Sequence, residues 1–113
     1  MADSLGIFEQ AVLLALVRLG DGAYGRAIFK AVQDRLQREI AAGAVHATLE
    51  RLERKRLVTS RLGPGTEIRG GRARRYYRVS SAGLRALNDA REAVDGLWRG
   101  IMWPLSKLKE QPQ

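Results

Sequence analysis

The spacing of apolar residues predicts three helices in the first half of the chain. From residue 5 to residue 19, apolar side chains cover most of the helical circumference, and Ser4 precedes them as a candidate N-cap. Residues 20–22 interrupt this pattern, and apolar residues return at helical spacing over 24–36. A third helix is predicted to open at Gly43.

Beyond the third helix, the pattern changes to that of β-strands. Residues 57–62 and 74–79 are predicted to be strands, and the Gly-rich stretch 63–73 joins them into a hairpin. A brief strand near Ile40 is a further option, between the second and third helices. Three helices followed by a basic hairpin indicate a winged helix-turn-helix, whose third helix enters the major groove of DNA.

The last predicted helix begins at Ser80 or Ser81 and continues to about Trp103, because Pro104 prevents a regular continuation. Its heptad positions are Leu84, Arg91, Trp98 and Leu105 in one row, and Leu87, Val94, Ile101 and Leu108 in the other. A lone helix cannot bury such a seam in so small a domain, and the first helix, apolar on most sides, also needs two partners. We therefore expect a homodimer, with contacts from Leu13, Leu84, Leu87, Val94, Trp98, Ile101 and Leu105.

The expected fold class is mostly α with a small β-hairpin, a winged helix-turn-helix plus a C-terminal dimerisation helix. Residues 1–79 would form the DNA-binding domain and residues 80–109 the dimerisation helix. Packing of the seam within one chain is the alternative. Trp98 and Trp103 could instead line a flat pocket for a small apolar effector between the protomers.

Positive charge is concentrated in one quarter of the chain. The formal net charge of the 113 residues is +8, and residues 51–78 alone hold ten basic and two acidic side chains. Nine of the ten are arginines, whose planar fork suits phosphate groups and guanine edges. One concentrated block of a single sign indicates a polyanion as partner, here double-stranded DNA, whereas a face that only confers solubility has mixed signs.

The residues expected to contact DNA come from the third helix and the hairpin. With the apolar residues of the third helix turned inward, Ala47, Glu50 and Arg54 lie on the opposite face. The glycines of the hairpin tip let its arginines follow a groove. The predicted DNA contacts are His46, Ala47, Glu50, Arg51, Arg54, Lys55, Arg69, Arg72, Arg74 and Arg75. An ordinary solvated helix face and a loop without a role are the alternatives.

The composition disfavours several other classes of function. Without cysteine and with one histidine, the chain lacks sulfur-based zinc sites, and the pair His46 and Glu50 alone makes no metal site. Residues 20–25 match the GxGxxG pattern of dinucleotide-binding sites, but that site needs a preceding strand, and a helical pattern precedes it here. Asp21 is instead a candidate helix cap. No apolar run approaches the ~20 residues of a membrane span. We therefore expect no enzymatic activity, cofactor, metal or membrane contact, and a cytoplasmic protein.

Four stretches, which together span residues 5–100, resemble the PadR-like transcriptional regulators. They are residues 23–25, 43–58 through the third helix, 69–78 with Gly-Gly and paired tyrosines, and 79–83. His46 stands where the family usually has Tyr, and Arg56 stands where it usually has Gly. The resemblance, to the short branch with a single C-terminal helix, implies a homodimeric repressor that responds to a ligand or signal. The first and last helices would hold the dimer together.

Together, these observations predict a sequence-specific transcriptional regulator, a dimeric repressor that binds a palindromic operator. The third helix would lie in the major groove, and the basic wing would lie on the flanking backbone or minor groove. The alternatives are a basic module that binds acidic proteins or binds nucleic acid without sequence preference, and, more distantly, a dinucleotide-binding enzyme. A sequence preference on duplex DNA separates the first prediction from both alternatives.

Overall fold

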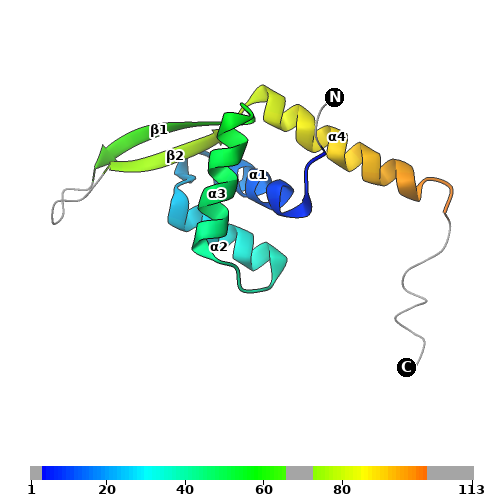
Figure 1. Cartoon of the computed structure of the whole chain (residues 1–113), viewed down its shortest axis with the longest axis horizontal. Coiled ribbons are helices and arrows are strands. Elements are labelled where there is room, and N and C mark those ends of the chain that lie inside the picture. Colours follow the sequence, from blue (N-terminus) through cyan, green and yellow to red (C-terminus); the bar gives the residue numbers. More distant parts are fainter. Residues whose placement is uncertain (1–3, 66–72, 102–113) are drawn as a thin grey trace.

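The protein is described by a computed structural model over residues 4–65 and 73–101, which contains four α-helices and one hairpin in that stretch of the chain (Figure 1). The elements are α1 (Ile7–Leu19), a 3-10 turn (Gly20–Gly22), α2 (Gly25–Leu36), α3 (Ala42–Arg54), β1 (Val58–Gly65), β2 (Ala73–Val79) and α4 (Ser81–Trp98). The helices α1, α2 and α3 form a central bundle, from which the hairpin projects to one side and α4 to the other. The predicted fold class is confirmed.

The core of the bundle is built around α1, which packs against α2, α3 and β2. Leu13 of α1 is fully buried at 0% exposure, so the prediction that Leu13 contacts a second chain is wrong. This helix is apolar on most of its circumference, and the structure turns Val12, Leu13 and Leu16 inward. The outward face of α1 instead carries Ile7, Leu14 and Val17.

The two ends of α1 are determined by glycines. Gly6, rather than the predicted Ser4, is the N-cap residue, and its backbone N–H donates to Glu9 Oε1 at 3.1 Å. At the other end, Gly20 adopts a φ of 57°, a left-handed value that side chains with a Cβ rarely take. The predicted helix break at residues 20–22 is therefore confirmed, and it allows α2 to turn back against α1.

The hairpin pairs β1 with β2 in an antiparallel register that places Val58 opposite Val79 and Arg61 opposite Tyr76. Its base is attached to the start of α2, because the Tyr77 N–H donates to the Ala23 carbonyl at 2.9 Å. An isolated bridge pairs Tyr24 with Tyr76, so the extra strand-like segment lies there. The brief strand expected near Ile40 is wrong, since that residue lies in the irregular connection between α2 and α3.

The start of α4 is fastened to the turn that follows α3. Ser80 is the N-cap, as one of two predicted positions, and its hydroxyl accepts the Gly83 N–H at 3.0 Å. The same hydroxyl donates to the Arg56 carbonyl at 2.8 Å, and the Ser80 N–H donates to the Leu57 carbonyl at 2.9 Å. The two hydrogen bonds from Ser80 to this turn therefore fix the direction in which α4 leaves the winged domain.

The end of α4 comes earlier than predicted. The helix ends at Trp98 instead of about Trp103, because Arg99 adopts an extended backbone and Gly100 a φ of 86°. Glycine weakens the last helical turn, and two glycines, Gly96 and Gly100, flank this end. Ile101 is thus exposed beyond the helix, so its predicted place in a helical heptad is wrong. Leu105 lies outside the described residues.

Gly83 is expected to tolerate no side chain. A Cβ on this residue would overlap the Leu57 carbonyl oxygen, which is backbone, and would approach Val79 Cγ1 at 2.7 Å. Gly83→Ala should lower the free energy of unfolding by about 1–3 kcal/mol in urea denaturation, the usual cost of overpacking. The matched control is Gly96→Ala on the same helix, whose Cβ meets nothing closer than 3.8 Å. This control should be neutral or should stabilise by up to about 1 kcal/mol. Equal effects of the two variants would contradict the close approach.

Candidate nucleic-acid interface

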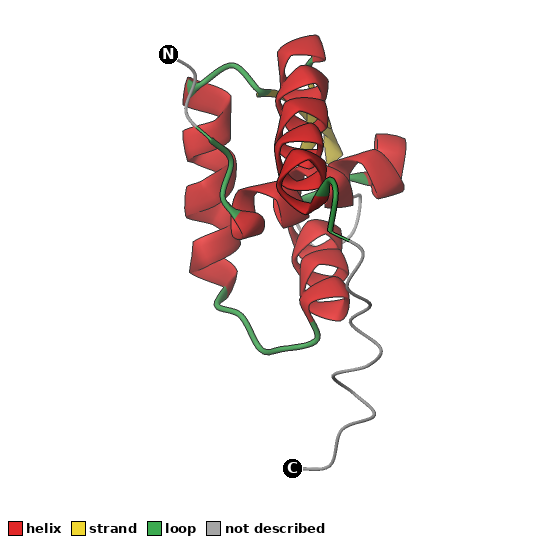
Figure 2. Cartoon of the chain, turned by 90° about the vertical axis from the view of Figure 1, so that its right-hand side faces the viewer, coloured by secondary structure: helices red, strands yellow, loops and turns green. Residues whose placement is uncertain are grey.

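The outer face of α3 is the part of the predicted interface that the structure presents most clearly. Its inner residues Val45, Thr48, Leu49 and Leu52 are buried. Figure 2 shows α3 upright at one edge of the molecule, with the other two helices of the bundle on a single side of it. His46, Ala47, Glu50 and Arg54 are exposed on the open side, as predicted. We call these four residues the reading face of α3. It combines a small residue, an acid and two side chains, His46 and Arg54, that carry nitrogen donors.

His46 and Glu50 contact each other across one helical turn, with His46 Nε2 and Glu50 Oε2 3.6 Å apart. Both side chains are more than half exposed, at 67% and 58%, so the pair contributes little to stability. At small cost, His46 can exchange this partner for a base edge or a phosphate, and Glu50 can exchange it for a hydrogen-bond donor on a base edge. Among the described residues, no group of three histidine, cysteine, aspartate or glutamate side chains is placed to hold a metal ion.

A groove of about 620 Å³ separates α2 from α3 beside this reading face. Phe29, Val45 and Leu49 contribute its apolar surface, while Arg26 and Lys30 of α2 add basic groups. These two cations were not among the predicted DNA contacts, because α2 lies outside the basic block of residues 51–78. The two cations are four residues apart and lie on the same side of the predicted helix as Phe29. This sequence pattern could have predicted them as part of the interface.

One face of the hairpin carries arginines that stack on tyrosines. The Arg74 guanidinium carbon lies 4.3 Å from the centre of the Tyr24 ring, and that of Arg61 lies 5.1 Å from the Tyr76 ring. The two rings contact each other edge to face at 5.9 Å. Stacking of this kind holds a guanidinium in place and leaves its N–H groups directed sideways. Arg74 is one of the predicted DNA contacts, whereas Arg61, which pairs with Tyr76 in the register of the hairpin, is not.

The other face of the hairpin is joined to α3. Arg75 Nη1 donates to Ser60 Oγ at 3.0 Å, and Ser60 Oγ donates to Glu53 Oε2 at 2.7 Å. All three groups are on the surface, so the chain of bonds positions the hairpin more than it stabilises the fold. Arg75 is exposed, as predicted for a DNA contact, and lies on the side of the hairpin next to α3.

Three of the basic or acidic residues have partners within the protein that the sequence did not predict. Arg51 and Lys55 both contact the Glu9 carboxylate, so their side chains extend from the flank of α3 towards α1. Asp21 pairs with Arg78 of β2 at 2.9 Å, and no cap hydrogen bond from it is present, so its predicted capping role is wrong. Arg69 and Arg72 lie outside the described residues.

The predicted dimer contacts on α4 fall into two groups. Leu84, Val94 and Trp98 are exposed large apolar side chains, at 52%, 46% and 46%, whereas Leu87 packs against the core of its own chain. Leu97, exposed at 77%, belongs with the first group and was missed, because it lies outside the heptad rows. Of the expected effector pocket, Trp98 is described and Trp103 lies outside the described residues, so the pocket stays a prediction.

A family model for the transcriptional regulator PadR-like family matches residues 13–89, which is more than half of the chain. The chain belongs to the PadR-like family. Within this PadR-like regulator, the matched stretch runs from α1 through both strands of the hairpin into α4. Its GxGxxG segment follows a helix, α1, and so lacks the strand that a dinucleotide-binding site requires.

Solved structures agree with this assignment. A PadR family transcriptional regulator from Eggerthella lenta is 31% identical, with a TM-score of 0.63 over 89% of this chain and 82% of that chain. A PadR-like transcriptional regulator from Bacillus cereus is 17% identical, with a TM-score of 0.68 over 95% of both chains. BpsR from Bordetella bronchiseptica, whose DNA binding is regulated by 6-hydroxynicotinic acid, is 18% identical, with a TM-score of 0.63 over 96% of this chain and 76% of that chain. No curated protein matched the chain.

The PadR-like regulator thus has a winged-helix fold in which α3 packs beside a hairpin that carries several arginines. None of its helices in residues 4–65 and 73–101 is both long and apolar enough to cross a membrane. The likeness to the structures below 25% identity establishes the fold, whereas the family assignment establishes a role in transcriptional regulation and DNA binding.

Proposed function

We propose that this chain is a dimeric, sequence-specific repressor that binds duplex DNA in the cytoplasm. In this proposal, α3 enters the major groove and the hairpin contacts the flanking backbone or minor groove. The regulation of transcription follows from the family; the sequence preference, the dimer and the repressor role are the parts proposed.

The observation that carries the proposal is the exposed face of α3. It presents Ala47, Glu50 and Arg54 together on the side that no other described element covers. A small residue permits close approach to the duplex, an arginine can donate two hydrogen bonds to guanine, and a glutamate can accept one from cytosine. Stacked Arg61 and Arg74 supply the neighbouring cations that position the protein on phosphates.

The dimer is supported by the outer surface of α4. The exposed apolar residues Val94, Leu97 and Trp98 lie within five positions of one helix, and an apolar surface of this kind typically marks an interface. A two-fold dimer would place its two α3 helices about one turn of DNA apart, roughly 34 Å, and would match a palindromic operator.

Sequence selection tests the proposal directly. Purified protein is incubated with a pool of random duplexes at physiological salt, and the bound fraction is amplified and sequenced over several rounds. We expect an inverted repeat whose half-sites are centred about 10 base pairs apart. Enrichment without a shared motif would instead support a module that binds nucleic acid without sequence preference. No retained DNA at all would support a protein-binding module.

A repressor role adds one further expectation. A promoter that contains the selected repeat should drive a reporter less strongly when the protein is present, because the bound dimer would compete with polymerase. Increased reporter expression would mean that the protein is an activator. A small apolar effector stays a prediction, since only Trp98 of its expected pocket is described.

A further inference from the structure

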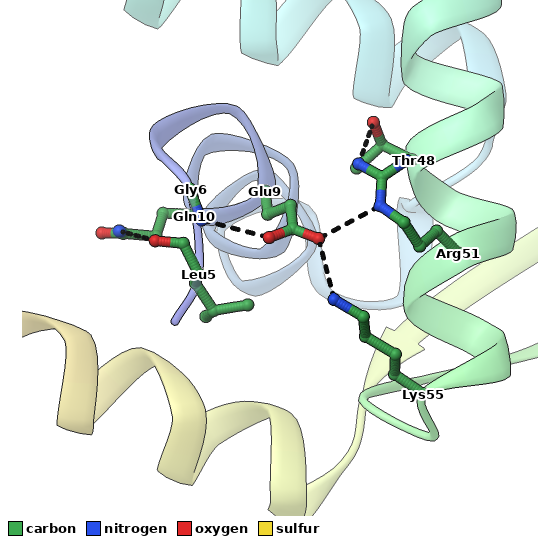
Figure 3. A network of polar contacts seen from close by, with 7 residues as sticks. All are labelled: Leu5, Gly6, Glu9, Gln10, Thr48, Arg51 and Lys55. Carbon is green, nitrogen blue, oxygen red and sulfur yellow. Dashed lines mark hydrogen bonds and ion pairs between the residues drawn. The ribbon is translucent and has the colours of Figure 1, made fainter. Parts of the chain in front are cut away.

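The buried carboxylate of Glu9 in α1 forms ion pairs with two basic side chains of α3. Glu9 is only 9% exposed, and its Oε2 accepts from Arg51 Nε at 3.2 Å and from Lys55 Nζ at 3.4 Å. Figure 3 shows both basic side chains extending from α3 towards this one oxygen atom. Glu9 is 42 positions away from Arg51 and 46 positions away from Lys55 in the sequence, so the contact is purely tertiary.

Both ends of this contact are fixed by further hydrogen bonds. The other carboxylate oxygen, Glu9 Oε1, accepts the Gly6 N–H at 3.1 Å, which holds the acid against its own helix start. Arg51 Nη2 donates to Thr48 Oγ1 at 3.4 Å, which holds the guanidinium along α3. Burial alone would raise the pKa of the Glu9 carboxyl. The Gly6 N–H, Arg51 and Lys55 more than offset this, so the pKa lies below its ordinary value of 4.5. Glu9 is therefore negatively charged at neutral pH.

Arg51 and Lys55 occupy one flank of the reading face. Successive residues turn by about 100° around a helix, so positions 51 and 55 lie between the buried position of Thr48 and the exposed positions of Ala47 and Arg54. Extended outward, side chains this long would reach the phosphates beside the groove in which α3 is proposed to lie. In the structure they extend towards α1 instead, and their side chains are 42% and 33% exposed.

We propose that Glu9 is a positioning residue that holds Arg51 and Lys55 away from the DNA backbone and so limits sequence-independent binding. The inference rests on the proposed mode of DNA binding, with α3 in the major groove. Phosphate contacts increase affinity for every duplex equally, whereas base contacts distinguish the operator. An acid that keeps two cations off the backbone therefore raises the ratio of operator to non-operator affinity.

The test is a salt titration of Glu9→Gln on a scrambled duplex. Glutamine preserves the shape of the side chain and removes its charge, so the ion pairs that hold both cations against Glu9 are lost. Each added phosphate contact steepens the fall of log Kobs with log salt by about 0.9. Two contacts per protomer should steepen it by nearly 2 per protomer, so the variant should bind the scrambled duplex more tightly than the wild-type protein at 50 mM salt.

Two control variants separate this effect from a general one. Glu92→Gln removes one negative charge from the exposed surface of α4 and should leave the salt slope nearly unchanged. Arg51→Gln combined with Lys55→Gln should also leave the slope on scrambled DNA nearly unchanged when Glu9 is intact, because the withheld cations make no phosphate contacts. Added to Glu9→Gln, the same pair should abolish the steeper slope.

Several outcomes would overturn the inference. A Glu9→Gln protein with a lower melting temperature and an unchanged salt slope would show a role in folding alone. If that variant fails to fold, the Arg51→Gln and Lys55→Gln protein decides: a slope reduced by nearly 2 per protomer would show that both cations already contact phosphates. A wild-type protein that binds no duplex would instead contradict the proposed function itself.

Discussion

Replacement of both Val94 and Leu97 by lysine is expected to convert a dimer into a monomer and to abolish operator binding. These side chains are 46% and 77% exposed on α4, so the variant should fold normally as a single chain. Two lysines in an apolar interface would bury unpaired charge, which costs several kcal/mol on each side. Sedimentation equilibrium at micromolar concentration should give about 12.6 kDa, in place of twice that mass.

The loss of DNA binding should follow from the loss of the dimer. A monomer offers one α3 helix, so it can occupy a half-site but cannot combine two half-sites in one binding event. Glu92→Lys is the matched control, because it adds the same two units of positive charge on the same helix outside the apolar residues. This control should remain a dimer and should retain its operator. A double-lysine variant that still sediments as a dimer would place the interface elsewhere, for example on the exposed face of α1.

Removal of the Arg54 side chain is expected to reduce discrimination between operator and scrambled DNA. Arg54 lies at the centre of the exposed face of α3, and its side chain has no ion pair or hydrogen bond among the described residues. If it donates to a guanine edge, Arg54→Ala should cost about 1–3 kcal/mol per half-site on the operator and much less on scrambled duplex. Titrations of both duplexes at one fixed salt concentration measure this difference.

Arg54→Lys refines the test, because it keeps the positive charge and removes the planar fork. A base contact predicts that lysine behaves on the operator almost like alanine. A phosphate contact predicts that lysine restores most of the affinity on both duplexes. Equal losses on the two duplexes for Arg54→Ala would mean that Arg54 holds only the backbone. Specificity would then have to come from Ala47, Glu50 and the shape of the site.

The periodicity of the chain was sufficient to predict the element order and the exposed face of α3. The buried and exposed positions of a helix repeat every 3.6 residues, and α3 has one apolar stripe, so its outer face follows directly. The same reasoning failed for α1. That helix is apolar on most of its circumference, so periodicity cannot tell which side of it faces the core. The structure buries Leu13 and exposes Leu14, one position further along.

The flanks of α3 show a second limit of the sequence. Arg51 and Lys55 belong to the basic block, and their positions on the helix put them beside the reading face. Which neighbour lies at that flank depends on how α1 crosses α3, and this crossing is a tertiary property. Glu9 is the one acid among residues 7–17, and Gln10 is the other polar residue in that apolar run. The meaning of this isolated acid became clear only when the structure placed it against α3.

Arg56 illustrates how a departure from the family pattern gains a physical meaning. Its φ is 64°, in the left-handed region where glycine is favoured, and the family usually has glycine at this position. Its N–H donates to the Glu53 carbonyl at 2.9 Å and so closes the end of α3. An arginine here costs about 1–2 kcal/mol of backbone strain. Nothing in the spacing of the sequence indicated that this residue is left-handed.

The fastening of α4 to the turn after α3 has a consequence for the DNA itself. Because Ser80 is bonded to both Arg56 and Leu57, the proposed dimerisation helix cannot swivel freely relative to its own reading helix. One base pair inserted between two half-sites would shift them by about 3.4 Å and rotate them by roughly 35°. Two α3 helices that are held rigidly in one dimer cannot follow both this shift and this rotation. Among the operators of this protein, the identity of the bases between the half-sites would therefore be free to vary, while the number of these bases would stay fixed.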